Sequence, residues 1–302
     1  MVPQPNLRGR LVSLARTAFR PGWGLRSRLR PRLHSRLSAP AIVGIWLVAI
    51  LWCFPLLYML LTSFKGEGEV LPPSLWVAHP TLENYATILR LEFVHYIMDS
   101  GMIAVSSVLL CLVLGVPVAY VVVFGRLSNS DNLFFWFLST TLFPPVAVIV
   151  PVFLLFRFGG LLDSVAGMIL IYTGFNVPIV IWMTRSFLLD VPREMLESSD
   201  MDGASRLRSF FGIVLPLSRQ GIISTGLLVF IFVWNEFFFS INLTYVHAAP
   251  VSVYMASYMT QEGLFWAKLC AVSTLVVLPP MVLGWLAQRS LVKGLTLGAV
   301  KG

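Results

Sequence analysis

Apolar residues along this chain gather into six long runs, separated by polar, turn-rich connections. Each run has at least the roughly 20 residues that a helix needs to cross the hydrocarbon core of a bilayer. The runs lack the period-two alternation of barrel strands, and in lipid the backbone hydrogen bonds must be made within the segment, so helices are predicted. The predicted fold is an all-α membrane protein with six transmembrane helices: Ala41 to Ser63, Ile97 to Phe124, Leu133 to Phe156, Val165 to Phe187, Ile222 to Ile241 and Ala267 to Gln288.

The composition supports this fold class. Hydrophobic residues make up 57% of the chain and charged residues only 12%, whereas about 25% of residues are charged in ordinary soluble domains. A soluble globular domain is thereby excluded. The three cysteines, Cys53, Cys111 and Cys270, lie far apart inside apolar runs, so we interpret them as packing residues and not as a disulfide framework or metal ligands.

Positive charge is concentrated in the first 40 residues, which hold nine arginines and no acidic residue. We divide the chain into a basic cytoplasmic arm, residues 1–40, and a membrane domain, residues 41–302. No nucleic acid is expected as a partner, because basic residues that bind one would line a folded face; the expected partner is anionic membrane lipid. An organelle-targeting peptide or a cleaved signal sequence is the alternative, although five prolines interrupt the arm and the first apolar run is long for a signal core.

The basic residues also predict an orientation. If the spans alternate and the N-terminus is inside, 18 of the 22 lysines and arginines fall on the inner side, and only Lys65, Arg90, Arg157 and Lys268 fall outside. Cytoplasmic loops carry the excess of Lys and Arg in membrane proteins. Both termini are therefore predicted to lie in the cytoplasm.

Two connections are long enough to hold structure of their own. The outer one, Phe64 to Tyr96, carries apolar residues at helical spacing that predict one amphipathic helix: Leu82, Tyr85, Ile88 and Leu89. In the inner one, Leu188 to Gly221, Pro192 and Glu194 suit a first helical turn, and Gly203 suits the left-handed turn after a helix that ends near Met201. Beyond the glycine, one apolar stripe is predicted at Leu207, Phe210 and Phe211.

The sequence argues against an enzyme. No Gly-Lys pair occurs, so the phosphate-binding loop that ends in Gly-Lys-Ser/Thr is absent, and no cofactor is expected on this chain. The four histidines show no i, i+4 pairing that would hold a metal. Asp202-Gly203 is similar to the start of a phosphatidyl transferase motif, but that motif needs further aspartates downstream, and Asp202 is the last one in the chain.

The inner connection also contains a long spaced motif. It reads Glu197-Ser198-Ser199, three residues, Gly203, nine residues, then Ile213-Val214-Leu215-Pro216. At every spacing this resembles the EAA-x3-G-x9-I-x-LP signature of the permease subunits of bacterial ATP-binding-cassette importers. The string Asp202-Gly203-Ala204-Ser205 is similar to the form found in the carbohydrate-import branch. Three further stretches agree with that branch: residues 80–85, residues 234–237 and the tail from Gln288 to Gly302.

The resemblance covers the chain from about Pro40 onward and is to the smaller, six-span member of a maltose-type permease pair. It implies a bacterial inner-membrane location, a second homologous permease subunit, a dimeric ATPase that binds ATP and Mg, and a carbohydrate-type substrate. It also implies an extracytoplasmic solute-binding protein that docks near Phe64 to Tyr96. Glu197 through Pro216 would form the coupling loop, with Glu197 toward a basic group of the ATPase. Ser198 and Ser199 stand where the signature has two alanines. The alternative to a coupling loop is an amphipathic loop that lies on the membrane surface.

Polar residues in the fourth and fifth runs indicate a path for the substrate. If Glu236 faced lipid at mid-span, it would raise the free energy of membrane insertion by roughly 2.5–3.5 kcal/mol, so it must face protein or water. Hydrogen-bonding and aromatic side chains that suit a sugar lie nearby or in the fourth run: Asn176, Trp234, Asn235 and Asn242. The alternative role of Glu236 and Asn235 is to tie the span to a neighbouring helix. A secondary transporter or channel is the rival functional class, but it would usually show more ionisable residues near mid-membrane.

Overall fold

The computed structural model describes residues 39–90, 93–125, 129–260 and 263–297. It distinguishes two compact units, which meet between Phe54 and Pro55 inside the first span; the contacts below belong to the second unit. Among the described residues, five helices are long and apolar enough to cross a membrane, or six if one bent pair forms a single span. The prediction of an all-helical membrane protein is thus confirmed. Most of the basic arm and the last five residues of the tail lie outside the described residues.

Twelve α-helical segments and a few short elements make up the described chain. In order these are α2 (Ala39–Ser63), η1 (Glu67–Glu69), α3 (Glu83–Arg90), α4 (Phe93–Phe124), α5 (Ser130–Thr141), α6 (Pro145–Phe158), α7 (Val165–Leu188), α8 (Arg193–Met201), α9 (Arg206–Ser209), η2 (Phe210–Val214), α10 (Leu215–Trp234), α11 (Phe238–Leu243), α12 (Val251–Ala256), β1 (Met259–Thr260), β2 (Gly263–Leu264) and α13 (Trp266–Leu297). The strands β1 and β2 form one antiparallel pair. The predicted first, second, fourth and sixth spans correspond to α2, α4, α7 and α13, and the predicted outer helix corresponds to α3.

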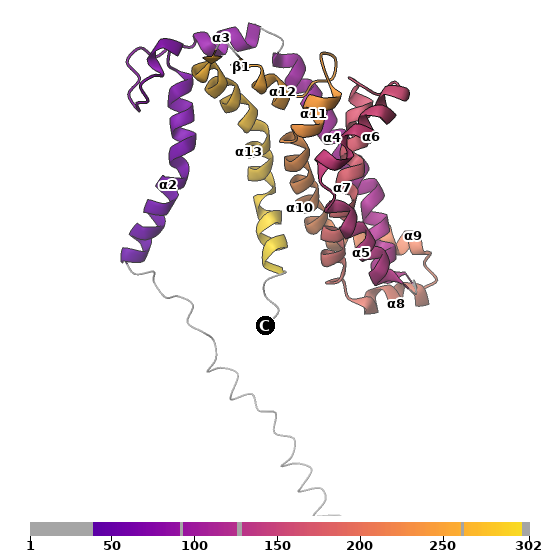
Figure 1. The fold of residues 1–302 in the computed structure, drawn as a ribbon. Helices are drawn as coiled ribbons and strands as arrows, with labels where there is room; N and C mark the ends of the chain where they lie inside the picture. The colour runs from indigo at the N-terminus through magenta and orange to yellow at the C-terminus, as the bar shows by residue number, and fades with distance from the viewer. Residues whose placement is uncertain (1–38, 91–92, 126–128, 261–262, 298–302) are drawn as a thin grey trace, which may run out of the picture. The chain divides into compact units, whose positions relative to one another are not determined.

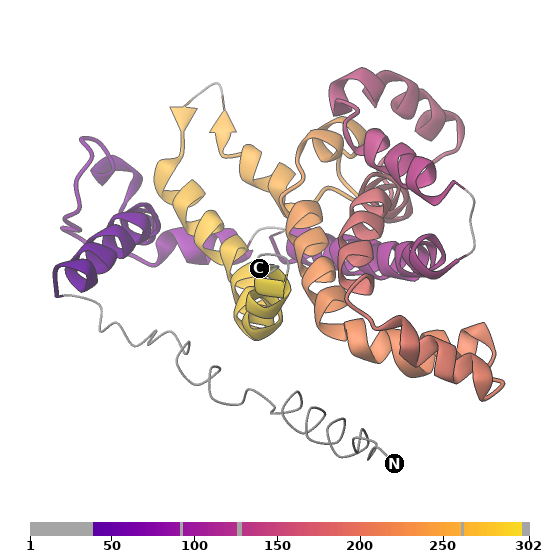
Figure 2. The same cartoon turned by 90° about the horizontal axis from the view of Figure 1, so that it is seen from below.

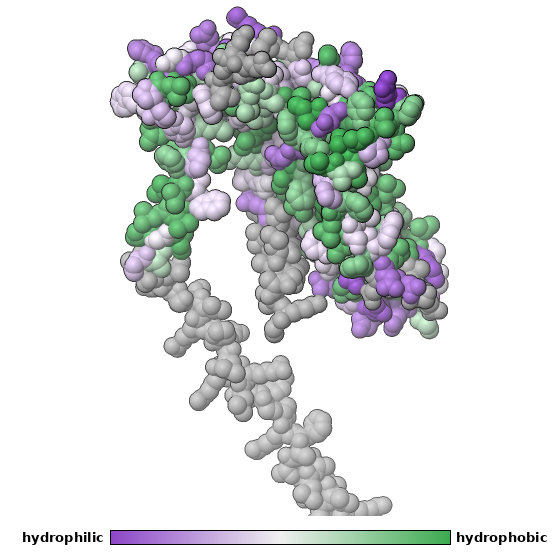
Figure 3. Space-filling model, in the orientation of Figure 1, coloured by the Kyte–Doolittle hydropathy of each residue, from purple (hydrophilic) through white to green (hydrophobic). Residues whose placement is uncertain are grey.

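The core of the second unit lies between α4, α7 and α10, which are side by side in Figures 1 and 2, with α13 packed on α10. Small residues let these helices approach closely, which is usual in membranes, where packing drives helix association. A Cβ atom at Gly115 of α4 would lie 2.6 Å from Val180 Cγ1 of α7, and one at Gly221 of α10 would overlap the Phe187 ring. Figure 3 shows hydrophobic residues over the middle of this bundle, with hydrophilic residues above and over α8 and α9 below.

The third span differs from its prediction. Leu133 to Phe156 was predicted as one helix, but the chain forms α5 and α6, which are bent by 87° at the break. The cause is the pair Pro144-Pro145: a residue before proline is driven from the helical region, and Pro145 can start a helix but not continue one. The bend went unpredicted because the residues around it remain apolar.

The fifth span is also different. It was predicted to run from Ile222 to Ile241, whereas α10 begins at Leu215 and ends at Trp234, and a separate helix α11 follows at Phe238. Residues 206–214 continue α10 on its N-terminal side through α9 and the π-helix η2, so that Arg206–Trp234 is the apolar segment long enough to span. Asn235 and Glu236 therefore lie at a break and not in a continuous helix.

The packing predicts the effect of a side chain at Gly115. Gly115→Ala should lower the free energy of unfolding by about 1–3 kcal/mol, the usual cost of overpacking, because Val180 Cβ, at 2.9 Å, cannot move without its backbone. Gly101→Ala on the same helix is the control, since nothing lies within 4 Å of its added atom. Thermal unfolding of the purified chain in detergent measures both. Equal stability of the two variants would show that α4 and α7 do not pack this closely.

Candidate functional site

The inner connection forms a short helical hairpin. Its first helix, α8, starts after Pro192, which is extended, has Glu194 in its first turn and ends at Met201. An acidic residue in the first turn interacts favourably with the positive end of the helix dipole. The helix predicted from Pro192 to about Met201 is therefore confirmed.

The turn after α8 is closed by two backbone hydrogen bonds. Ala204 N donates to Ser199 O at 3.0 Å and Gly203 N donates to Asp200 O at 3.1 Å, with Gly203 at φ +73°. This is the Schellman motif, in which the residue after the C-cap adopts the left-handed conformation that glycine accepts most readily. No atom lies within 4 Å of a Cβ built at Gly203, so the backbone conformation, not space, calls for glycine. The spacing from Ser199 to Gly203 follows from this turn.

The second half of the hairpin is held to the first by two serines. Ser199 Oγ and Ser209 Oγ are 2.8 Å apart, and Ser205 Oγ accepts from Arg208 N at 3.3 Å to cap α9. Ser199 thus joins α8 to α9, which alanine at that position of the signature could not do.

The predicted apolar stripe is only partly buried. Phe210 is buried and its ring lies 5.1 Å from that of Tyr120, but Leu207 and Phe211 are 70% and 61% exposed. Phe211 lies within the π-helix η2, whose wider turn changes the direction of its side chain relative to a regular helix, whereas Leu207 lies before η2 in α9. Pro216 follows η2 and has no N–H to donate back to the previous turn, so a wide turn at this point is physically reasonable.

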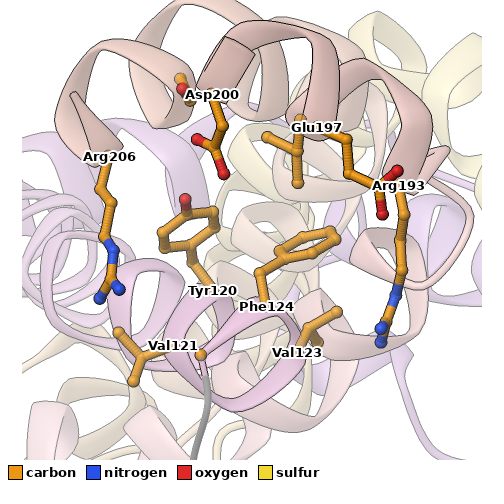
Figure 4. Close-up of a pocket in the computed structure, with 11 residues that line it drawn as sticks. Tyr120, Val121, Val123, Phe124, Arg193, Glu197, Asp200 and Arg206 are labelled. Atoms are coloured by element: carbon orange, nitrogen blue, oxygen red, sulfur yellow. The ribbon is translucent and has the colours of Figure 1, made fainter. Parts of the chain in front are cut away.

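The motif residues line two cavities on opposite sides of α8. One, of about 440 Å³, lies between α8 and the end of α4, and Glu197 and Asp200 line it. Figure 4 shows the Asp200 carboxylate directed toward the Tyr120 hydroxyl. The other, of about 530 Å³, is lined by five further motif residues: Ser198, Ser199, Asp202, Ala204 and Ile213. Leu215 and Pro216 begin α10 beyond both cavities.

The break in the fifth span is held by Glu236. Its carboxylate accepts from Phe239 N at 2.9 Å and Ser240 N at 3.3 Å, at the start of α11. Tyr172 of α7 donates its hydroxyl to the same carboxylate at 2.7 Å, and Ser252 Oγ donates to Glu236 O at 2.8 Å. Glu236 therefore satisfies amides that the break frees and links the fifth span to α7, which is the tie that the sequence left open as an alternative.

The other residues of the predicted substrate path are not brought together. Trp234 is buried, stacks on Phe230 at 5.4 Å and donates Nε1–H to Val276 O at 3.2 Å, so it joins α10 to α13. Asn176 is buried one turn after Tyr172 and donates to Tyr172 O. Asn235 and Asn242 are exposed and donate to carbonyls of their own segments, but the break puts them on different helices. Asn235 and Asn242 therefore do not lie on one continuous helix.

Two further carboxylates hold connections between helices, and neither role was predicted from the sequence. Asp163, at φ 51°, accepts from four consecutive amides of residues 245–248 at 2.9–3.2 Å. Partial burial raises the pKa of Asp163, but these donors outweigh it and hold the pKa below its usual range. Glu67 accepts from Ala267 N and Lys268 N at the start of α13. In the sequence, the only indication of these two roles is that Glu67 and Asp163 are acidic residues close to the end of a predicted span.

Known proteins are similar to this chain in sequence and in fold. Residues 111–292 match the family described as binding-protein-dependent transport system inner membrane component. The chain belongs to this family. It is 33% identical over 259 residues, 85% of the chain and 93% of the relative, to "Probable ABC transporter permease protein y4oR" of Sinorhizobium fredii. It is 31% identical over 268 residues, 86% of the chain and 96% of the relative, to "Trehalose/maltose transport system permease protein MalG" of Thermococcus litoralis.

The fold agrees with that of a solved transporter. A chain of a bacterial ABC transporter that imports alginate superposes with a TM-score of 0.67 at 19% identity, covering 95% of this chain and 99% of that one. The protein is thus the permease component of a binding-protein-dependent ABC importer in the inner membrane, and ATP is bound by a separate ATPase. The rival interpretation as a secondary transporter or channel does not hold.

The contacts of this permease predict the effect of removing the Tyr172 hydroxyl. Tyr172→Phe keeps the ring but removes the bond to Glu236, and should lower the free energy of unfolding by about 1.5–3 kcal/mol, typical of a hydrogen bond to a charged group. Tyr245→Phe, in an exposed loop, is the matched control. Thermal unfolding in detergent is measured for Tyr172→Phe, for the control, for Glu236→Gln and for the double variant of Tyr172 and Glu236. The last two together with Tyr172→Phe give a double-mutant cycle. Strictly additive effects would show that the two side chains do not interact.

Proposed function

We propose that this permease carries a carbohydrate or a related polyol into the cytoplasm. Support comes from the trehalose/maltose permease of Thermococcus litoralis, to which the chain is 31% identical over most of its length, and from the local string Asp202 to Ser205. A second homologous permease subunit completes the pathway across the membrane. The solute-binding protein docks on the outer side near Phe64 to Tyr96.

The hairpin of α8 and α9 is the coupling loop that receives the ATPase in this proposal. The observation that carries it is the turn at Gly203, whose Schellman hydrogen bonds explain the spacing of a signature that ABC permeases share. The side chains of Leu207 and Phe211 are exposed beside it and offer apolar surface to a partner. Glu197 is exposed and forms no ion pair within the described part of the chain, so it remains open to a basic group of the ATPase.

The orientation follows from the same proposal. Five basic residues lie from Arg185 to Arg219, at the end of α7, in the connection that holds α8 and α9 and at the start of α10, and such connections lie in the cytoplasm. An ATPase is cytoplasmic, so the hairpin and the Lys and Arg distribution agree. Both termini then lie inside, with the arm of residues 1–40 at the inner leaflet.

The substrate path runs past the break in the fifth span. Asn235 is exposed at the end of α10 and is the path residue best placed to contact a solute hydroxyl. The other residues assigned to the path are Asn176, Trp234, Glu236 and Asn242; the hydrogen bonds of Glu236 and the burial of Trp234 favour a supporting role for these two.

The coupling proposal predicts different outcomes for two substitutions of Gly203. Gly203→Val should abolish ATPase co-purification and solute-stimulated ATP hydrolysis, because a β-branched residue is strongly disfavoured at positive φ. Gly203→Asn should retain both to a large extent, since asparagine visits this conformation. Membrane insertion of both variants is measured in parallel. If inserted Gly203→Val supports normal coupling, the hairpin is not the ATPase contact.

The path proposal predicts an effect on the solute and not on assembly. Asn235→Ala should weaken solute affinity by about 1 kcal/mol, roughly five-fold, the net value of one hydrogen bond. Asn132→Ala, at an exposed position of α5, is the control of the same kind. Concentration-dependent uptake into proteoliposomes that hold the assembled transporter measures the affinity. Unchanged affinity together with a lower yield of complex would assign Asn235 to helix packing.

A further inference from the structure

The outer connection after the first span contains a closed loop. Thr81 N donates to Phe64 O at 2.8 Å, which brings the two ends of residues 65–80 together directly after α2 ends at Ser63. In Figure 1 this loop is the indigo segment next to the outer end of α2. Its position is fixed at the point where the chain leaves the first span.

A buried lysine holds the loop from inside. Lys65 is only 1% exposed, and its Nζ donates to Ser74 O at 2.5 Å and to Ser74 Oγ at 3.1 Å. Ser74 Oγ in turn donates to Trp76 O at 3.2 Å. A buried ammonium is costly unless it is hydrogen-bonded, so these bonds fix the conformation of residues 74–76.

This anchored loop presents large apolar side chains outward. Leu71, Leu75 and Trp76, which we call the apolar tip, are 67%, 51% and 80% exposed. No charged residue occurs from Val70 to Ala78. The acids on its N-terminal side are engaged elsewhere in the fold: Glu67 caps α13, and Glu69 Oε1 lies 2.6 Å from His79 Nδ1.

We propose that the apolar tip lies in the boundary between headgroups and acyl chains of the lipid leaflet around the first span. The interfacial zone is roughly 5–8 Å thick on each side of the hydrocarbon core, and the loop closes where α2 leaves that core. Tryptophan is enriched at this depth because its ring is amphipathic. An uncharged tip enters the boundary without desolvating a charge, whereas the polar contacts of the loop point inward to Lys65.

The apolar tip fixes the depth in the membrane of the outer connection after the first span. Lys65 ties it to the exit of α2, and Asn84 of α3 donates to Ser63 O and Lys65 O at 2.9 and 2.8 Å. Glu67 joins the same loop to the start of α13. The lipid contact thereby sets the depth of the first and sixth spans together and leaves α3 as the part of the outer connection that is open to the solute-binding protein.

Spin labels in the assembled transporter test this contact. In a background with Cys53, Cys111 and Cys270 changed to alanine, Trp76→Cys and Leu75→Cys are labelled in nanodiscs of phosphatidylcholine and phosphatidylglycerol, without the solute-binding protein. Glu83→Cys, exposed at the start of α3, is the control. We expect oxygen collisions, relative to those of a water-soluble nickel chelate, to be several-fold more frequent at positions 75 and 76 than at 83. Adding Lys65→Met or Ser74→Ala should increase label mobility and reduce this ratio.

Two results would overturn the proposal. In the first, the labels at 75 and 76 are as accessible to the nickel chelate as the label at 83, so the tip is in water. In the second, they become protected only when the solute-binding protein is added, which makes the tip a protein-docking surface. Neither result depends on ATPase coupling or solute affinity, so the proposed function is tested separately.

Discussion

Backbone amides that have no partner inside a helix are the constraint on which this structure depends. Within a membrane no water is available to satisfy them, and each unsatisfied group costs several kcal/mol. Carboxylates accept from such amides at three places: Glu236 at the start of α11 within the fifth span, and Glu67 at the start of α13 and Asp163 at residues 245–248 in the connections next to the spans. Because two of these acceptors lie more than 80 residues from their donors in the chain, they also join segments that hydrophobic packing alone leaves unspecified.

The inner hairpin solves the same problem with backbone and small side chains. The carbonyls at the end of α8 accept from Gly203 and Ala204, and the serine hydroxyls at positions 199 and 209 join its two short helices. Buried apolar contact contributes one anchor, Phe210 on Tyr120. A hairpin that is held mostly by its own hydrogen bonds keeps its outer side chains exposed, which suits a surface that another subunit covers.

Much of this fold could be predicted from hydrophobic runs, and the failures have physical causes. The runs located α2, α4, α7 and α13 because lipid solvation requires about 20 apolar residues whatever the packing. They failed at Phe143 to Pro145 and after Trp234, where the residues on both sides of a break remain apolar. A tie to a neighbouring helix was one of two roles predicted for Glu236, but the partner Tyr172, 64 residues away in the chain, could not be predicted from the sequence. The Gly203 turn could be predicted, because its chemistry is local.

The π-helix η2 makes chain length between Gly203 and Pro216 a structural parameter in its own right. A π turn holds one residue more than an α turn, and each residue of an α-helix corresponds to about 100° of rotation. If the five residues Phe210–Val214 were wound as a regular α-helix instead, the extra residue would rotate α9, with the surface it carries, by about that angle relative to α10. The direction in which the hairpin faces is thus encoded by a residue count as much as by residue identity.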